Sequence, residues 1–354
     1  MKCAIFPFSH DVQTIINNLT SSNKHEVCCV LTSREDCLTQ QNKVVPLISE
    51  LDKLKNFDFD LVCVADYPKE KFSFSYYNNI VKNLSGRGIR VMLEPAWYEK
   101  ITTNNPIELS HLEALQDTFA NSFKAQSDSF YEVNAPVIVV AGLSPNTNKF
   151  DTQVIFRNAF VEKGYKVSSI ASNSLGSIIG MHSMPLPLFS NSVSFPNKVQ
   201  IFKEYIGAID YQESPDLIIV GVPGGIMPHN NKITNYFGEF AKVITSAVQV
   251  DVAILTIGFA RNIDLESLVE LKSYCRQKLD IVDCEILISN NRISLNSNES
   301  EYETYFLSES FIYELLSNES VKEQNATYFA DCLGLNIMID RIINNLSSNV
   351  CPIV

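Results

Sequence analysis

The sequence predicts an α/β protein built on parallel sheets, and three features support this prediction. Continuous apolar runs of strand length, such as "EVCCVLT" at 26–32 and "PVIVVAG" at 136–142, are typical of strands covered on both faces. Stretches with apolar residues at helical spacing alternate with these runs. Glycines such as Gly164 follow several of the helix-like stretches and would end them. Strand–helix alternation favours parallel sheets with helices packed against them.

Residues 1–100 predict a Rossmann-like N-terminal domain. Strands are expected at 2–8, 26–32, 59–66 and 89–94, with helices at 11–19 and 76–84. The first strand-to-helix turn, "FPFSHDV", lacks a glycine-rich fingerprint, so the sequence gives little support for dinucleotide binding there. His10 and Asp11 follow the first strand, where they either belong to a helix cap and solvated turn or contact a ligand.

Residues 101–134 are expected to form a linker with a helix, followed by a P-loop-type parallel α/β domain at 135–295. The strands of that domain are expected at 136–142, 165–172, 215–225, 250–259 and 284–289, and its helices at 152–164, 198–209, 236–248 and 265–279. Residues 296–354 predict a C-terminal helical extension, with a strand-like stretch at 303–310 and a closing helix over 326–346. That helix serves either packing or an oligomer interface, which leaves a homo-oligomer open.

Composition excludes several classes of protein. At 354 residues, 45% of them hydrophobic, the chain is long enough for two or three domains with real cores. The net charge of −12 argues against a nucleic-acid-binding protein and against a basic protein that binds membrane surfaces. No apolar run reaches membrane-spanning length, and no secretory signal is evident. The nine cysteines form no CxxC pair, so buried thiols in a cytoplasmic protein are expected.

The stretch "AGLSPNTNKFDT" at 141–152 has most features of a phosphate-binding loop. It joins a strand to a helix, and six residues separate Gly142 from Lys149, one more than in the standard pattern. Such a loop points backbone amides at phosphate, and its lysine reaches the outer phosphates. Asn148 replaces the usual glycine, and asparagine is the best other residue for a left-handed backbone. We expect ATP or GTP to bind at Gly142, Ser144, Asn146, Thr147, Asn148, Lys149, Asp151 and Thr152.

Both usual magnesium ligands of such a site are missing. Phe150 stands where a serine or threonine would bind the metal, and Gly221 stands where the neighbouring strand would carry an acid. Asp151 and Thr152 are the remaining candidates, so Mg²⁺ binding is left open. Because the metal neutralises charge on the transferred phosphoryl group, we expect poor hydrolysis of a bound nucleotide.

Two other stretches are candidates for substrate contacts. In "VGVPGGIMPHNNKITNYFG" at 220–238, a glycine pair lets backbone approach a ligand, although a tight turn with a polar surface is the alternative. His182, among apolar residues and prolines at 180–189, is either a packing residue or a substrate contact. The sequence gives no catalytic constellation and no metal-ligand spacing. The substrate candidates are His182, Gly224, Gly225, His229, Asn230 and Lys232.

The segments 137–173, 180–185 and 216–238 resemble a family of clostridial peptide maturation proteins, which are encoded beside bacteriocin-like precursor peptides and radical SAM enzymes. The resemblance covers most of the chain and is strongest over 136–260. More distantly, the layout is similar to dethiobiotin-synthetase-like P-loop proteins, including D-glutamate N-acetyltransferase-like members, whose second motif carries an acid where this chain has Gly221. The closer resemblance implies a role in maturing a ribosomally made peptide.

These observations leave two classes of function open. The leading hypothesis is a nucleotide-binding protein of a peptide-maturation pathway; as an enzyme it would be an ATP-dependent ligase or a phosphoryl or acyl transferase, acting on the peptide or on a small molecule. The alternative is a non-catalytic partner that binds the precursor peptide and presents it to a modifying enzyme. The missing metal ligands favour the second class, whereas Lys149 and the glycine pair favour the first.

Overall fold

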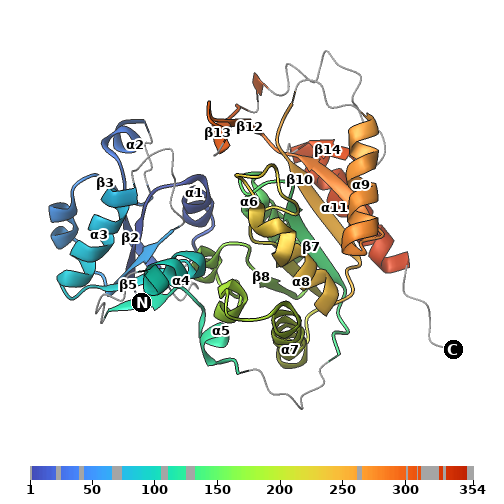
Figure 1. Cartoon of the computed structure of the whole chain (residues 1–354), viewed down its shortest axis with the longest axis horizontal. Helices are drawn as coiled ribbons and strands as arrows, with labels where there is room; N and C mark the ends of the chain where they lie inside the picture. The colour runs from blue at the N-terminus through green and yellow to red at the C-terminus, as the bar shows by residue number, and fades with distance from the viewer. Residues whose placement is uncertain are drawn as a thin grey trace. The chain divides into compact units, whose positions relative to one another are not determined.

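The computed structural model describes residues 2–20, 25–39, 44–65, 74–104, 111–124, 132–260, 265–299, 302–308, 310–311, 327–329 and 332–348. They belong to two compact units (Figure 1). Unit 1 comprises Met1–Lys124 and Asn173–Val193, and unit 2 comprises Ala125–Ser172 and Ser194–Val354. The domain limits expected at residues 100, 134 and 295 stay predictions.

Six parallel strands form the sheet of unit 1, in the order β3-β2-β1-β4-β5-β6. They are β1 (Lys2–Phe6), β2 (Glu26–Leu31), β3 (Leu47–Ile48), β4 (Leu61–Val64), β5 (Arg90–Leu93) and β6 (Leu112–Ala114). This order is typical of Rossmann-like sheets, and it confirms the fold class expected for the N-terminal part.

Unit 1 also contains helices, and several of them bury apolar residues against this sheet. They are α1 (His10–Asn17), α2 (Arg34–Thr39), α3 (Phe74–Gly86), α4 (Pro95–Asn104) and α5 (Thr118–Ser122), with the shorter η1 (Leu51–Asn56), η2 (Ser174–Ile179) and η3 (Leu186–Phe189). On α3, Tyr77 and Leu84 are fully buried against Phe6 and Leu93 of the strands. The segment 173–193 also belongs to unit 1, although it lies between two strands of unit 2 in the sequence.

The first strand-to-helix turn forms a helix cap, which is one of the two alternatives expected for it. The Ser9 hydroxyl accepts the Val12 amide at 3.2 Å, which makes Ser9 the cap. Asp11 accepts a hydrogen bond from Asn173 Nδ2 at 2.8 Å. Asp11 therefore ties the segment 173–193 to α1 within unit 1.

A second sheet of six parallel strands forms the centre of unit 2, in the order β14-β11-β10-β7-β9-β8. They are β7 (Val137–Gly142), β8 (Val167–Ile170), β9 (Leu217–Gly221), β10 (Val252–Ile257), β11 (Cys284–Ile288) and β14 (Thr327–Phe329). From β7 the chain first reaches β8 and β9 on one side and then β10 on the other. The carboxyl end of β7 is therefore a topological switch point, where open α/β sheets bind ligands.

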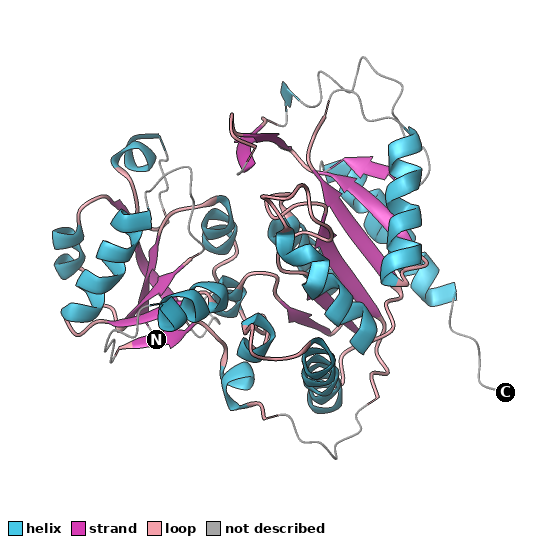
Figure 2. Cartoon of the chain, viewed as in Figure 1, coloured by secondary structure: helices cyan, strands magenta, loops and turns pink. Residues whose placement is uncertain are grey.

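Helices lie on both faces of this sheet (Figure 2). α6 (Lys149–Glu162) and α11 (Cys332–Ser348) bury Phe156, Phe160, Met338 and Ile342 against one face. Three further helices of the unit pack side by side: α7 (Phe195–Glu213), α8 (Glu239–Ala247) and α9 (Leu265–Leu279). The P-loop-type layout and the C-terminal helix expected from the sequence are confirmed.

Three expectations for unit 2 were wrong in detail. Residues 327–329, expected to begin the closing helix, form the edge strand β14, because they pair with β11; the helix begins at Cys332. The strand expected at 303–310 is present, but as β13 (Tyr302–Phe306) it ends earlier, and it pairs with β12 (Asn291–Leu295) in a separate hairpin. The helix expected from residue 236 begins at Glu239, after the turn η4 (Asn235–Gly238), whose residues are left-handed.

Candidate phosphate-binding site

The loop 143–148 connects the central strand β7 to the N-terminus of α6. Gly142 closes the strand, and the loop folds back tightly over it. A Cβ at Gly142 would lie 2.3 Å from Oγ1 of Thr147 and 2.6 Å from the Ser144 carbonyl oxygen. Only glycine therefore fits at the start of this loop.

Asn148 adopts the left-handed conformation that the sequence pattern requires before the lysine. Its φ is 56° and its ψ is 25°. Two neighbours hold its side chain: Nδ2 donates to Oδ1 of Asn290 at 2.5 Å, and Oδ1 accepts from Nδ2 of Asn291 at 3.3 Å. Asn148 therefore supplies the backbone shape of a glycine and also anchors the loop to the segment after β11.

Lys149 is the first residue of α6 and is 8% exposed. Its ammonium group donates to the Pro145 carbonyl at 2.5 Å, so the side chain curls over the loop. Among the described residues, no acceptor is hydrogen-bonded to the backbone amides of Ser144, Asn146, Thr147, Asn148 or Phe150. Unsatisfied amides at a helix N-terminus, with a buried lysine beside them, make a site suited to phosphate.

The interior of the loop is held by Thr256 at the end of β10. The hydroxyls of Thr147 and Thr256 lie 2.6 Å apart, and both residues are fully buried. Thr256 Oγ1 donates to the Ala141 carbonyl at 3.1 Å. Nδ2 of the buried Asn291 donates to the Asn146 carbonyl. Residues more than a hundred positions away in sequence therefore fix the shape of the loop.

Other groups occupy the sequence positions at which a P-loop would carry its magnesium ligands. Phe150 is 2% exposed and has no oxygen to offer. Thr152 Oγ1 donates to the Asn148 carbonyl at 3.0 Å, within its own helix. Asp151 is the one carboxylate in the first turn of α6. The described residues contain no group of three or more metal-ligating side chains. The residues present do not fit a P-loop magnesium site.

Gly221, at the end of β9, has no room for the missing acid. A Cβ there would lie 2.3 Å from Oε1 of Gln153 and 2.6 Å from the Ser172 amide nitrogen. Gln153 is fully buried, accepts the Ser172 amide at 3.1 Å and donates to the Ile170 carbonyl at 2.6 Å. The space next to Gly221 is therefore occupied by a glutamine that joins α6 to the end of β8.

The loop after β9 lies directly against the loop 143–148, which we call the phosphate loop below. The Ile226 amide donates to the Gly142 carbonyl at 3.0 Å. A Cβ at Gly225 would lie 2.9 Å from the Leu143 carbonyl oxygen and 3.1 Å from Cα of Ser144. Gly224 is left-handed, with φ 72°. The glycine pair thus allows close approach, but the chain segment it approaches is the phosphate loop itself.

The polar residues of this second loop contact the β12–β13 hairpin. Asn230 Nδ2 donates to the Glu299 carbonyl at 3.0 Å, and Lys232 Nζ donates to the Asn298 carbonyl at 2.7 Å. His229 is exposed, and its amide donates to the Ile233 carbonyl at 2.9 Å. Their expected role as substrate contacts stays a prediction.

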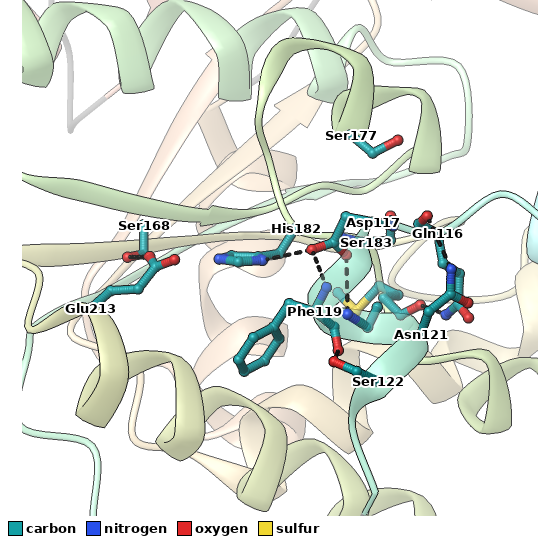
Figure 3. Close-up of polar contacts among 12 residues, drawn as sticks. Gln116, Asp117, Phe119, Asn121, Ser122, Ser168, Ser177, His182, Ser183 and Glu213 are labelled. Atoms are coloured by element: carbon teal, nitrogen blue, oxygen red, sulfur yellow. Dashed lines mark hydrogen bonds and ion pairs between the residues drawn. The ribbon is translucent and has the colours of Figure 1, made fainter. Parts of the chain in front are cut away.

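His182 belongs to unit 1 and lies beside Asp117 (Figure 3). Its Nδ1 is 3.0 Å from Oδ2 of Asp117, and its ring packs on Phe119. Asp117 also caps α5 and accepts the Ser183 amide at 3.0 Å. Burial would raise the pKa of Asp117, but the hydrogen bonds from His182 and the Ser183 amide hold it below the usual value. These contacts fit the packing interpretation of His182.

Sequence reasoning missed four residues that shape the site. Gln153, Thr256, Asn290 and Asn291 are polar residues inside or beside apolar stretches. A buried polar residue near the carboxyl end of a predicted parallel strand is the signal that could have indicated Thr256. No local pattern indicates which loop such residues contact.

Comparison with solved structures gives a likeness over the full chain. The crystal structure of a DUF1611 family protein from Anabaena variabilis matches with a TM-score of 0.62 and 11% identity, over 98% of this chain and 99% of that one. The chain has the fold of that protein. Sequence identity at this level carries nothing about activity.

Weaker likenesses cover 60% of the chain at 11% identity and a TM-score of 0.35. They are cobyrinic acid a,c-diamide synthase from Mycobacterium smegmatis, solved with ADP and magnesium, and a plasmid partition protein from Borrelia burgdorferi; 96% and 100% of those chains are covered. Scores this low support no conclusion here. No protein-family model matches the sequence, and no curated protein matches it. No match links the chain to peptide maturation.

Among the described residues, no helix has both the length and the apolar character needed to span a membrane.

Proposed function

We propose that unit 2 binds the phosphate groups of a nucleotide, ATP or GTP, at the loop 143–149, and retains the nucleotide without efficient cleavage. The observation that carries this proposal is the left-handed Asn148 directly before the buried Lys149, at the first turn of a 14-residue helix. This arrangement presents several amides, a lysine and the positive end of a helix dipole to one position.

The same site argues against rapid hydrolysis. A P-loop enzyme uses magnesium to neutralise charge on the transferred group. Phe150 and Gly221 offer no ligand, and Thr152 is engaged with the Asn148 carbonyl. Binding without turnover is therefore the function that these residues support best.

The proposed setting is the maturation of a ribosomally made, bacteriocin-like peptide in the cytoplasm. This part rests on the sequence resemblance over 136–260 alone. A protein that holds a nucleotide without cleaving it fits a partner that binds the precursor peptide and presents it to a modifying enzyme. An ATP-dependent ligase or transferase acting on the peptide or on a small molecule is the alternative, and the retained Lys149 is what favours it.

Calorimetric titration of the purified chain with ATP and GTP, with and without Mg²⁺, tests the proposal, with phosphate release followed in parallel. We expect binding that changes little with Mg²⁺ and no sustained phosphate release. Lys149→Ala removes a charge-assisted contact and should weaken binding roughly 10- to 100-fold. Lys163→Ala, at the far end of the same helix, is the matched control and should bind as the original chain does.

The outcomes separate the hypotheses. Sustained phosphate release would replace the retention hypothesis with the enzyme hypothesis. An absence of nucleotide binding, or equal affinities for the original chain and Lys149→Ala, would remove the phosphate site. Adding a bacteriocin-like precursor peptide tests the peptide partner, since a presenting protein must bind it.

A further inference from the structure

Four successive residues of the turn Asn235–Gly238 have left-handed backbones. Their φ values are 49° at Asn235, 52° at Tyr236, 53° at Phe237 and 72° at Gly238. Left-handed conformations are unfavourable for residues with a side chain, most of all for bulky ones, and occur mainly as single residues. Three in succession, two of them aromatic, require the surrounding structure to hold them.

The neighbours of the turn supply that restraint. Asn235 Nδ2 donates to the Met227 carbonyl at 2.8 Å. Gly238 is so close to the Ile226 carbonyl oxygen that a Cβ would lie 2.1 Å from it. The ring of Tyr236 meets Phe240 edge to face, with centroids 5.5 Å apart. The turn is therefore a fixed feature of unit 2 with one defined backbone path.

What this fixed backbone displays is an exposed aromatic surface. Phe237 is 74% exposed and Tyr236 is 55% exposed. The Tyr236 ring is braced by Phe240 and lies 3.5 Å from the position of a Cβ at Gly224. A phenylalanine 74% exposed on a constrained, left-handed backbone is the kind of feature that clusters at ligand-binding sites.

The turn Asn235–Gly238 lies near the start of the phosphate loop, with Gly225 between them. Gly225 separates them: a Cβ there would lie 2.9 Å from the Leu143 carbonyl oxygen on one side and 2.9 Å from Nδ2 of Asn235 on the other. One glycine therefore lies between the start of the phosphate loop and the start of the aromatic turn. A ligand whose phosphates lie on the loop 143–149 and whose remaining part extends past Gly225 would meet this turn.

We propose that Phe237, supported by Tyr236, is the stacking surface for the planar base of the nucleotide whose phosphates bind at 143–149. This inference rests on the proposed function and adds the element that recognises the base. A flat aromatic face binds any base by stacking and needs no hydrogen bonds. The site therefore accepts ATP and GTP with similar affinity and binds a base-free polyphosphate less tightly.

Titration of the full chain with ATP, GTP and inorganic tripolyphosphate tests this assignment. Phe237→Ala should weaken ATP and GTP binding about ten-fold, the usual scale for loss of one stacking contact, and leave tripolyphosphate binding unchanged. Phe237→Tyr should bind as the original chain does. Tyr211→Ala, which removes a side chain 73% exposed at the end of α7, is the matched control and should change nothing. Thermal melting confirms that each variant is folded.

The results distinguish a failure of this inference from a failure of the proposed function. If ATP and tripolyphosphate both bind through Lys149, but Phe237→Ala changes neither affinity or both equally, the stacking assignment is wrong and the phosphate site stands. If Phe237→Ala weakens ATP alone, the assignment holds. If the original chain binds none of the three ligands, both the phosphate site and the stacking surface are wrong.

Discussion

Glu285, in the middle of unit 2, makes the stability of the protein depend on pH. It lies on β11 and is 0% exposed, and neither of its carboxylate oxygens accepts a hydrogen bond from a described residue. The nearest cation is Nε of Arg341 on α11, 3.1 Å from Oε1. Burial raises the pKa of Glu285 from 4.5 to about 7, against the opposing attraction of Arg341 and Lys272 and with a further rise from Asp283.

The sign and size of the effect follow from proton linkage. Between pH 4.5 and about 7 the unfolded chain has lost this proton while the folded chain retains it. Stability therefore falls as pH rises through this window, and the contribution is fully present only below it. A pKa displacement from 4.5 to about 7 corresponds to about 3 kcal/mol of unfolding free energy, at about 1.4 kcal/mol per pH unit.

Urea unfolding of the original chain and Glu285→Gln, followed by circular dichroism at pH 5, 6, 7 and 8, measures this. Glutamine stays neutral, so the variant should match the original chain at low pH and exceed its stability by up to about 3 kcal/mol at pH 8. Glu266→Gln, an exposed carboxylate on α9, controls for loss of a charge alone. Parallel stability curves for Glu285→Gln and the original chain, or a variant less stable at pH 8, would refute the reasoning.

Two further predictions concern packing and charge. Gly221→Ala should destabilise the protein by roughly 2–3 kcal/mol, because its Cβ overlaps Gln153, whereas Gly86→Ala, with nothing within 4 Å, should be close to neutral; denaturant midpoints compare them. Asp117→Asn should lower stability by about 1–3 kcal/mol at pH 7, because the charge-assisted contact with His182 is lost. The pKa of Asp117 is lowered, so this difference should shrink as pH falls below 3.8, which the same unfolding assay follows.

Most strands could be predicted because they are buried on both faces. The run 136–142 is apolar throughout and 250–259 is interrupted only by Asp251 and Thr256, as is typical of parallel strands between two helix layers. Sequence reasoning missed β12, which has five residues, and also β3, β6 and β14, which have two or three residues each. Segments this short carry no periodicity, and they are strands only because a longer neighbour offers them an edge.

The candidate site likewise has one part that the sequence could predict and one part that it could not. The conformation of Asn148 could be predicted because it depends on local backbone preference and on its place before Lys149. The groups that hold the loop could not, because they arrive from β10 and from the segment after β11. Their contacts depend on strand order, which places β10 beside β7. The grouping of 173–193 with unit 1 was likewise invisible, since it depends on contacts made by α1.

Packing accounts for the missing acid at Gly221, and the residue responsible, Gln153, lies on the same helix as Phe150. Gly221 must lack a side chain because Gln153 fills the space beside it, and Gln153 lies one turn along α6 from Phe150. Restoring an acid by Gly221→Asp alone would therefore force Gln153 away from Ile170 and Ser172 before any metal could bind. The phosphate side of the site is held by a separate set of contacts, through Thr147 and Asn148. A chain built in this way can keep the shape of the loop 143–148 intact while core packing leaves no room for an acid at Gly221.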